Sequence, residues 1–127
     1  MTWFAASVIL HVRFKDGNQS KFPVWENVLL IDSATASEAL MRAESIGKNG
    51  EGDSGGSFTW EGRPAEWICA GVRKLVAVSN PDDIEDAPGD GAEITYSQFE
   101  VDDEASLQRL ARGEEVNLRY LEESGRR

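Results

Sequence analysis

Strict alternation near the N-terminus constrains the fold more than any other feature of this sequence. Between residues 3 and 14 every even position is apolar, while the odd positions include His11 and Arg13. This period of two is typical of a β-strand with one buried face, because successive side chains of a strand point to opposite sides. The residues predicted to form the buried face are Phe4, Ala6, Val8, Leu10, Val12 and Phe14.

Turn residues at 16–19 separate this strand from a β-rich run at 22–31, which predicts a long hairpin with Pro23 near the start of its second strand. Thr35 and Glu38 form a capping box, and Gly47 is expected to end the helix that follows. A second helix is predicted at 103–112. Further strands are predicted at 58–60, 65–78 with a bend at Gly71, 93–101 and 116–121.

The resulting element order, β-β-α-β-β-β-α-β, predicts an α+β fold. In that fold a largely antiparallel sheet is covered on one face by the two helices. A chain of 127 residues can bury a core of its own without disulfide or metal support. We therefore expect residues 1–121 to form a single α+β domain and residues 122–127 a polar C-terminal tail.

The net charge of −10 belongs to one segment of the chain. Residues 75–108 contain no Lys or Arg and ten acids, whereas the remaining residues carry equal numbers of acids and bases. The ten acids are Asp82, Asp83, Glu85, Asp86, Asp90, Glu93, Glu100, Asp102, Asp103 and Glu104. The first five lie in a Pro/Gly-containing loop at 79–92 and form the predicted acidic patch.

Composition excludes several classes of protein and of site. The acidic balance argues against a nucleic-acid partner, and no run approaches the roughly twenty apolar residues of a membrane helix. The apolar start of the chain lacks the basic flank of a signal peptide, and we expect a cytoplasmic protein. A single Cys rules out an intrachain disulfide and a Cys-based zinc cluster.

Catalytic and cofactor patterns are weak. A Cys69–His11 dyad is formally available, but the apolar neighbours of Cys69 favour a small core residue. The stretch Gly50–Gly55 matches a dinucleotide-binding pattern, yet it follows a helix instead of opening one. Neither acidic loop fits the calcium-loop template. The sequence therefore predicts no catalytic residue, no metal and no cofactor.

Aromatic and charged residues gather in two segments, around residues 25–26 and 60–73. Trp and Arg are enriched at binding hot spots, because each combines a large rigid surface with a polar group. The competing interpretation is packing within the sheet, with Glu26 paired to Arg63 or Arg73 across strands. The candidate binding residues are Trp25, Glu26, Trp60, Arg63, Glu66, Trp67 and Arg73.

Several sequence blocks in one order resemble a small bacterial family classified as a domain of unknown function. The blocks are Trp3-Phe-Ala-Ala-Ser-Val, Pro23-Val-Trp-Glu-Asn, Gly52-Asp-Ser, Phe58-Thr-Trp-Glu-Gly-Arg-Pro-Ala, Ala70-Gly-Val-Arg-Lys-Leu and Glu93-Ile-Thr-Tyr-Ser. The resemblance extends over residues 3–120 and implies a stand-alone bacterial protein with no assigned activity. It carries over no catalytic residue.

We expect a non-enzymatic binding protein, most concretely an immunity-like or inhibitor protein that docks on a basic macromolecule. The alternative is a small-molecule-binding domain or modest enzyme, with a Trp-lined pocket that uses Glu26, Glu66, Arg63 and Arg73. A third alternative is a homodimer formed through sheet edges or exposed Trp side chains.

Overall fold

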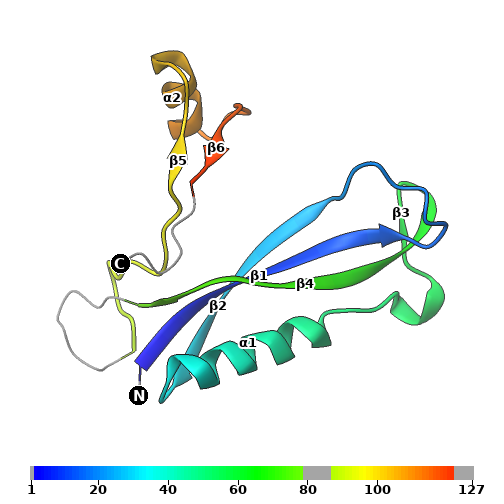
Figure 1. Cartoon of the computed structure of the whole chain (residues 1–127), viewed down its shortest axis with the longest axis horizontal. Coiled ribbons are helices and arrows are strands. Elements are labelled where there is room, and N and C mark those ends of the chain that lie inside the picture. The colour runs from blue at the N-terminus through cyan, green and yellow to red at the C-terminus, as the bar shows by residue number, and fades with distance from the viewer. Residues whose placement is uncertain (1, 79–86, 122–127) are drawn as a thin grey trace. The chain divides into compact units, whose positions relative to one another are not determined.

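The computed structural model describes residues 2–78 and 87–121 (Figure 1). It confirms the α+β class and the predicted order of strands and helices. The elements are β1 (Thr2–Phe14), β2 (Val24–Ser33), α1 (Ala36–Asn49), a 3-10 turn η1 (Ser54–Gly56), β3 (Thr59–Trp60), β4 (Arg63–Ala77), β5 (Phe99–Glu100), α2 (Glu104–Ala111) and β6 (Arg119–Tyr120).

The chain forms two compact units, Met1–Ile94 and Thr95–Arg127. The first unit contains β1 to β4 and α1. The second contains α2 and a two-stranded sheet in which Phe99 pairs with Tyr120 and Glu100 with Arg119. Strands β5 and β6 are shorter than predicted because the ladder between them covers only these two pairs. Asp103 caps α2 by accepting a hydrogen bond of 2.7 Å from the Ser106 N–H.

The sheet of the first unit is antiparallel, with strand order β2-β1-β4-β3. The alternating strand β1 lies in the interior and pairs along most of its length with β2 on one side and β4 on the other. Phe4, for example, stands opposite Ile31 of β2 and Ala77 of β4. Paired residues of an antiparallel ladder share a face, so the alternation in β1 sets the faces of both neighbours.

Strand β4 contains two register shifts beside Gly71. Ser7 pairs with Lys74 but Val8 pairs with Val72, and a second shift lies between Ile9 and Leu10. Each shift leaves one extra residue in β4, as in a β-bulge. Gly71 has a φ of 140°, which a residue with a side chain rarely adopts. The predicted irregularity at Gly71 is confirmed.

Helix α1 packs on β4, β1 and β2, and thereby covers one face of the sheet (Figure 1). The Thr35 hydroxyl accepts a hydrogen bond of 3.1 Å from the Glu38 N–H, which confirms the predicted start. The prediction that Gly47 ends the helix is wrong. The helix continues to Asn49, and Gly50 caps it. Gly47 is instead buried against the sheet, together with Ala39 and Ala43.

Two clusters of buried residues lie in the first unit. One lies beneath α1 and consists of Phe4, Ala6, Val8, Ile31, Ala39 and Ala43. The other consists of Val12, Phe14 and Ala65, with Phe58, Trp60 and Trp67 packed against it. Among the described residues, neither helix has the length and apolar character that crossing a membrane would require.

Candidate functional site

The candidate binding residues divide between the two faces of the sheet. The face under α1 carries the even-numbered residues of β1, and we call it the helix face. The other face carries the odd-numbered residues of β1, from Trp3 to Arg13, and we call it the reverse face. Trp25 pairs with Leu10 and therefore lies on the helix face, whereas Glu26 pairs with Ile9 on the reverse face.

On the helix face, Trp25, Trp60 and Trp67 form one aromatic cluster. The ring centroids of Trp25 and Trp67 lie 4.8 Å apart in an edge-to-face contact, and those of Trp25 and Trp60 lie 5.4 Å apart. Phe58 stacks on Trp67 at 5.6 Å. Three strands, β2, β3 and β4, thus contribute one Trp each to a packed cluster, which favours the packing interpretation for these side chains.

On the reverse face, Glu26 and Arg73 form an ion pair, as the competing interpretation allowed. The Arg73 Nε lies 3.1 Å from Glu26 Oε2, and Arg73 Nη2 binds the same oxygen. Partial burial alone acts to raise the pKa of the Glu26 carboxyl. The hydrogen bonds from Arg73, with the positive charge of Arg73 and Lys74, outweigh that effect, so the pKa of Glu26 is lowered. The pair stays ionised at neutral pH.

A second ion pair lies further along the same face. Arg13 and Glu66 are direct partners in the β1–β4 ladder. The Glu66 Oε2 atom accepts hydrogen bonds from Arg13 Nη2 at 2.9 Å and Arg13 Nε at 3.1 Å. Because Glu66 and Trp67 are consecutive strand residues, the carboxylate and the indole point to opposite sides of the sheet.

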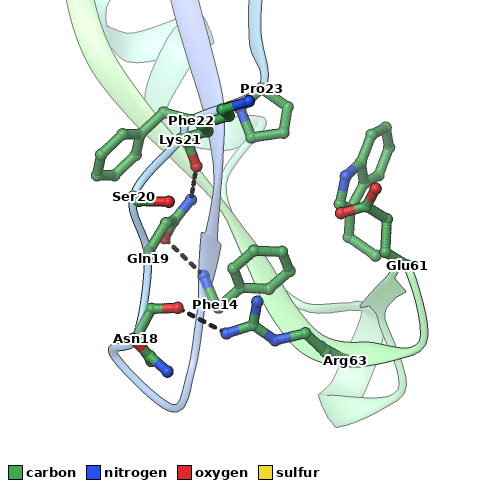
Figure 2. Close-up of a pocket in the computed structure, with 10 residues that line it drawn as sticks. Phe14, Asn18, Gln19, Ser20, Lys21, Phe22, Pro23, Glu61 and Arg63 are labelled. Carbon is green, nitrogen blue, oxygen red and sulfur yellow. Dashed lines mark hydrogen bonds between the residues drawn. The ribbon is translucent and has the colours of Figure 1, made fainter.

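A pocket of about 500 Å³ lies between the β1–β2 connection and the β3–β4 turn (Figure 2). Two candidate residues, Trp60 and Arg63, contribute to its wall. The full lining is Phe14, Asn18, Gln19, Ser20, Lys21, Phe22, Pro23, Trp60, Glu61 and Arg63. The lining combines aromatic surface with two basic side chains and one acidic side chain.

Arg63 joins the two sides of this pocket. Its Nη2 donates to both carboxylate oxygens of Asp16, at 2.7 and 2.8 Å, and to the Asn18 carbonyl at 2.8 Å. Its guanidinium carbon lies 3.6 Å from the centroid of the Phe14 ring, a cation–π contact. The pKa of Asp16 is lowered by the hydrogen bond from the Asn18 N–H and by that from Arg63.

Gln19 braces the wall formed by the β1–β2 connection. Its amide oxygen accepts from the Phe14 N–H at 3.1 Å, and its amide nitrogen donates to the carbonyls of Val12 and Lys21 at 2.8 and 3.0 Å. Figure 2 shows the amide turned toward the backbone of Phe14 and Lys21. Sequence reasoning marked residues 16–19 only as a turn and missed the roles of Asp16 and Gln19. The abundance of side-chain amides and carboxylates in that turn was the available signal.

An apolar stripe lies on the reverse face, along β2 and the segment just before it. It consists of Phe22, Val24, Val28 and Leu30, whose exposed fractions are 54%, 56%, 43% and 47%. Val24, Val28 and Leu30 pair with odd-numbered residues of β1, so their side chains lie on the reverse face. Phe22 contacts the edge of the His11 ring on that side, with centroids 5.6 Å apart. We call these four residues the β2 stripe.

Most of the predicted acidic patch, Asp82, Asp83, Glu85 and Asp86, lies outside the described residues. Asp90 lies within a turn and is exposed.

The structure does not bring the side chains of Cys69 and His11 together. Cys69 pairs with Leu10 and packs against the core beneath α1, whereas His11 pairs with Ile68 on the reverse face. The two side chains therefore project from opposite sides of the sheet. Within the described ranges, no three His, Cys, Asp or Glu residues are grouped so that they could hold a metal ion.

The first unit coincides with a recognised family region. A family model described as a domain of unknown function, DUF4288, matches residues 3–97. The chain belongs to this family. The DUF4288 region spans β1 to β4 with α1, and hence the aromatic cluster, both reverse-face ion pairs and the pocket. It ends before α2, so the match is shorter than the 3–120 expected from the sequence blocks. No curated protein and no solved structure matches the chain.

Proposed function

We propose that this DUF4288 protein is a non-enzymatic binding protein that docks on another macromolecule through the reverse face of its sheet. The observation that carries this proposal is the β2 stripe, with the Glu26–Arg73 ion pair beside it. Exposed apolar side chains gathered on one strand are typical of contact surfaces. Glu26 lies between Val24 and Val28 on the same face, so its ion pair with Arg73 stands within this surface and can supply orientation and selectivity to a docked partner.

The charge distribution favours a basic partner. Residues 2–78 carry nine acids and eight bases, so the four-stranded sheet and α1 are nearly neutral. The excess negative charge follows them in the sequence, within 75–108. A localised acidic segment accelerates association with a basic protein and imitates a polyanionic substrate. The specific form of the proposal is therefore an immunity-like or inhibitor protein directed against a basic toxin or nuclease. We place it in the bacterial cytoplasm, where a lone thiol such as Cys69 stays reduced.

The test is affinity capture from native-cell extract with the full chain and a Val24→Thr/Val28→Thr variant. Thr keeps the β-branched shape that a strand favours while it removes apolar surface. Met41, 66% exposed on α1, provides the control variant Met41→Gln. We expect a basic protein that the wild type and the control retain and the double variant loses.

A second measurement tests the charge argument on the captured partner. The association rate should fall steeply with added salt, and again when Asp82, Asp83, Glu85 and Asp86 are neutralised to Asn and Gln. A partner that the double variant retains, at a rate indifferent to salt, would refute both parts of the proposal.

The pocket supports a second candidate function, the binding of a small molecule. Aromatic walls from Phe14, Phe22 and Trp60, together with Lys21 and Arg63, suit an aromatic carboxylate. Glu26, Glu66 and Arg73 do not line this pocket, so its chemistry depends on Arg63 alone among the predicted charged residues. Titration of aromatic carboxylates should quench Trp fluorescence in the wild type and less so in Arg63→Gln. Equal quenching in both proteins would place the ligand elsewhere.

A further inference from the structure

Strand β2 has an outer edge that no described strand covers. Strand β2 is the terminal strand of the order β2-β1-β4-β3, and no strand of the described chain pairs with its far side. Residues 24–33 contain no Lys or Pro, which commonly protect an exposed edge from pairing, and their two charged residues are Glu26, which pairs with Arg73, and Asp32. Val24, Trp25, Val28 and Leu30 are all exposed along this edge.

The register identifies the backbone groups that face outward. The Val12 N–H donates to the Pro23 carbonyl at 3.1 Å, so the odd-numbered residues of β2 exchange hydrogen bonds with β1. In an antiparallel pair these residues alternate with ones whose N–H and C=O point away. The outward-facing residues are therefore Val24, Glu26, Val28, Leu30 and Asp32.

The free segment is symmetric about Asn27. At Asp32 the Arg42 side chain occupies this outward edge, because its Nη1 donates a hydrogen bond of 3.0 Å to the Asp32 carbonyl where a neighbouring strand would have to pair. Four residues with free outward groups remain, Val24, Glu26, Val28 and Leu30, and their midpoint is Asn27. We propose that two copies of this chain pair through the outer edges of β2, antiparallel about a two-fold axis at Asn27. This inference does not rest on the proposed partner, although the paired edge shares Val24, Val28 and Leu30 with the β2 stripe.

The side chains suit this register. Val24 would stand opposite Leu30 of the second copy, and Trp25 opposite Leu29, so both faces gain apolar pairs. Glu26 would face Val28, and its charge is already balanced by Arg73. No two like charges meet directly. The pairing joins two four-stranded sheets into one, with the closed symmetry of an isologous dimer.

A two-fold axis at Asn27 predicts a specific cross-link. Two residues on the axis form a non-hydrogen-bonded pair, with Cα atoms about 4.5 Å apart, within the range of a disulfide. Asn27→Cys in a Cys69→Ala background should form a covalent dimer rapidly on mild oxidation. Val28→Cys in the same background is the matched control. Residue 28 and its copy would be diagonal neighbours about 7–8 Å apart, too far for efficient bridging.

Sedimentation equilibrium of the full chain provides the non-covalent test. We expect a dimer whose dissociation constant rises about tenfold in Asn27→Lys, because two ammonium groups then meet on the axis. Asn49→Lys makes the same change at an exposed position at the end of α1 and should leave the dimer unchanged. Circular dichroism verifies that each variant is folded. A wild type that stays monomeric at NMR concentrations, a dimer indifferent to Asn27→Lys, or equal cross-linking at positions 27 and 28 would overturn the proposal.

Discussion

Trp25 and Glu26 are consecutive residues of β2 that make contacts on opposite faces of the same sheet. The Trp25 ring meets Trp67 on the helix face at 4.8 Å, while the Glu26 carboxylate binds Arg73 on the reverse face. The alternation of a strand forces this separation. Substitutions at these two adjacent positions therefore report on two different sets of contacts, one of aromatic packing and one of charge.

Replacing Trp67 should weaken the fold more than replacing Trp3. The ring of Trp67 contacts both Trp25 and Phe58, and aromatic pairs contribute beyond the area that they bury. We expect Trp67→Leu to lower the free energy of unfolding by about 1–3 kcal/mol. Trp3→Leu is the control, since Trp3 has no ring contact in the described chain. Urea denaturation followed by circular dichroism measures both, and equal losses would argue against the aromatic cluster.

The Glu26–Arg73 pair should make stability depend on pH. The pKa of Glu26 is lowered in the folded state, so its contribution is complete above the ordinary value of 4.5 and is lost as pH falls through the folded value. Glu26→Gln should cost about 0.5 kcal/mol at pH 7, with the discount appropriate to a partly exposed pair. The difference from wild type should shrink by pH 3. Urea midpoints at both pH values test this, and Glu44→Gln, at an exposed position on α1, is the control variant.

Replacing the side-chain amide of Gln19 by a carboxylate should destabilise the protein. The amide nitrogen of Gln19 donates hydrogen bonds to the carbonyls of Val12 and Lys21, whereas a carboxylate has no hydrogen to donate. We expect Gln19→Glu to lower the free energy of unfolding at pH 7 by about 1–3 kcal/mol, because two carbonyls then lose their partner. The loss should diminish at low pH, where the protonated acid can donate once. A variant as stable as the wild type at pH 7 would show that the brace is dispensable.

Gly47 should tolerate no larger side chain. A Cβ at this position would lie 2.6 Å from the Cys69 Sγ and 3.0 Å from a methyl carbon of Val8. We expect Gly47→Ala to destabilise the protein by about 1–2 kcal/mol despite the better helix propensity of Ala. Adding Cys69→Ala removes the closer contact and should recover part of the loss. Thermal unfolding of the four variants of this cycle measures the coupling, and strict additivity would contradict a contact between the two positions.

The sequence was informative where local chemistry decides the structure. Thr35 begins α1, as the capping box predicts, because a side-chain oxygen at a helix start accepts a hydrogen bond from an otherwise unsatisfied backbone N–H. The alternation in β1 likewise predicted its buried face. Gly47 was misread because a glycine near the end of a helical pattern fits either a cap or a close approach to another strand. Only the packing of α1 on Cys69 distinguishes these two roles.

The candidate site depended far more on tertiary structure. Residue types alone identified Trp25, Glu26, Arg63 and Arg73 as a group, and the Glu26–Arg73 pair was among the pairings weighed. Strand register determines which residues share a face of the sheet. It pairs positions some fifty residues apart in the sequence, such as Arg13 with Glu66. The two shifts in β4 alter that register in ways that no local pattern specifies. The sequence by itself thus determined the order of the strands and helices and the start of α1. Pairing between distant strands decided which side chains form the aromatic cluster, the ion pairs and the pocket, because those contacts arise only once the strands have paired in their final register.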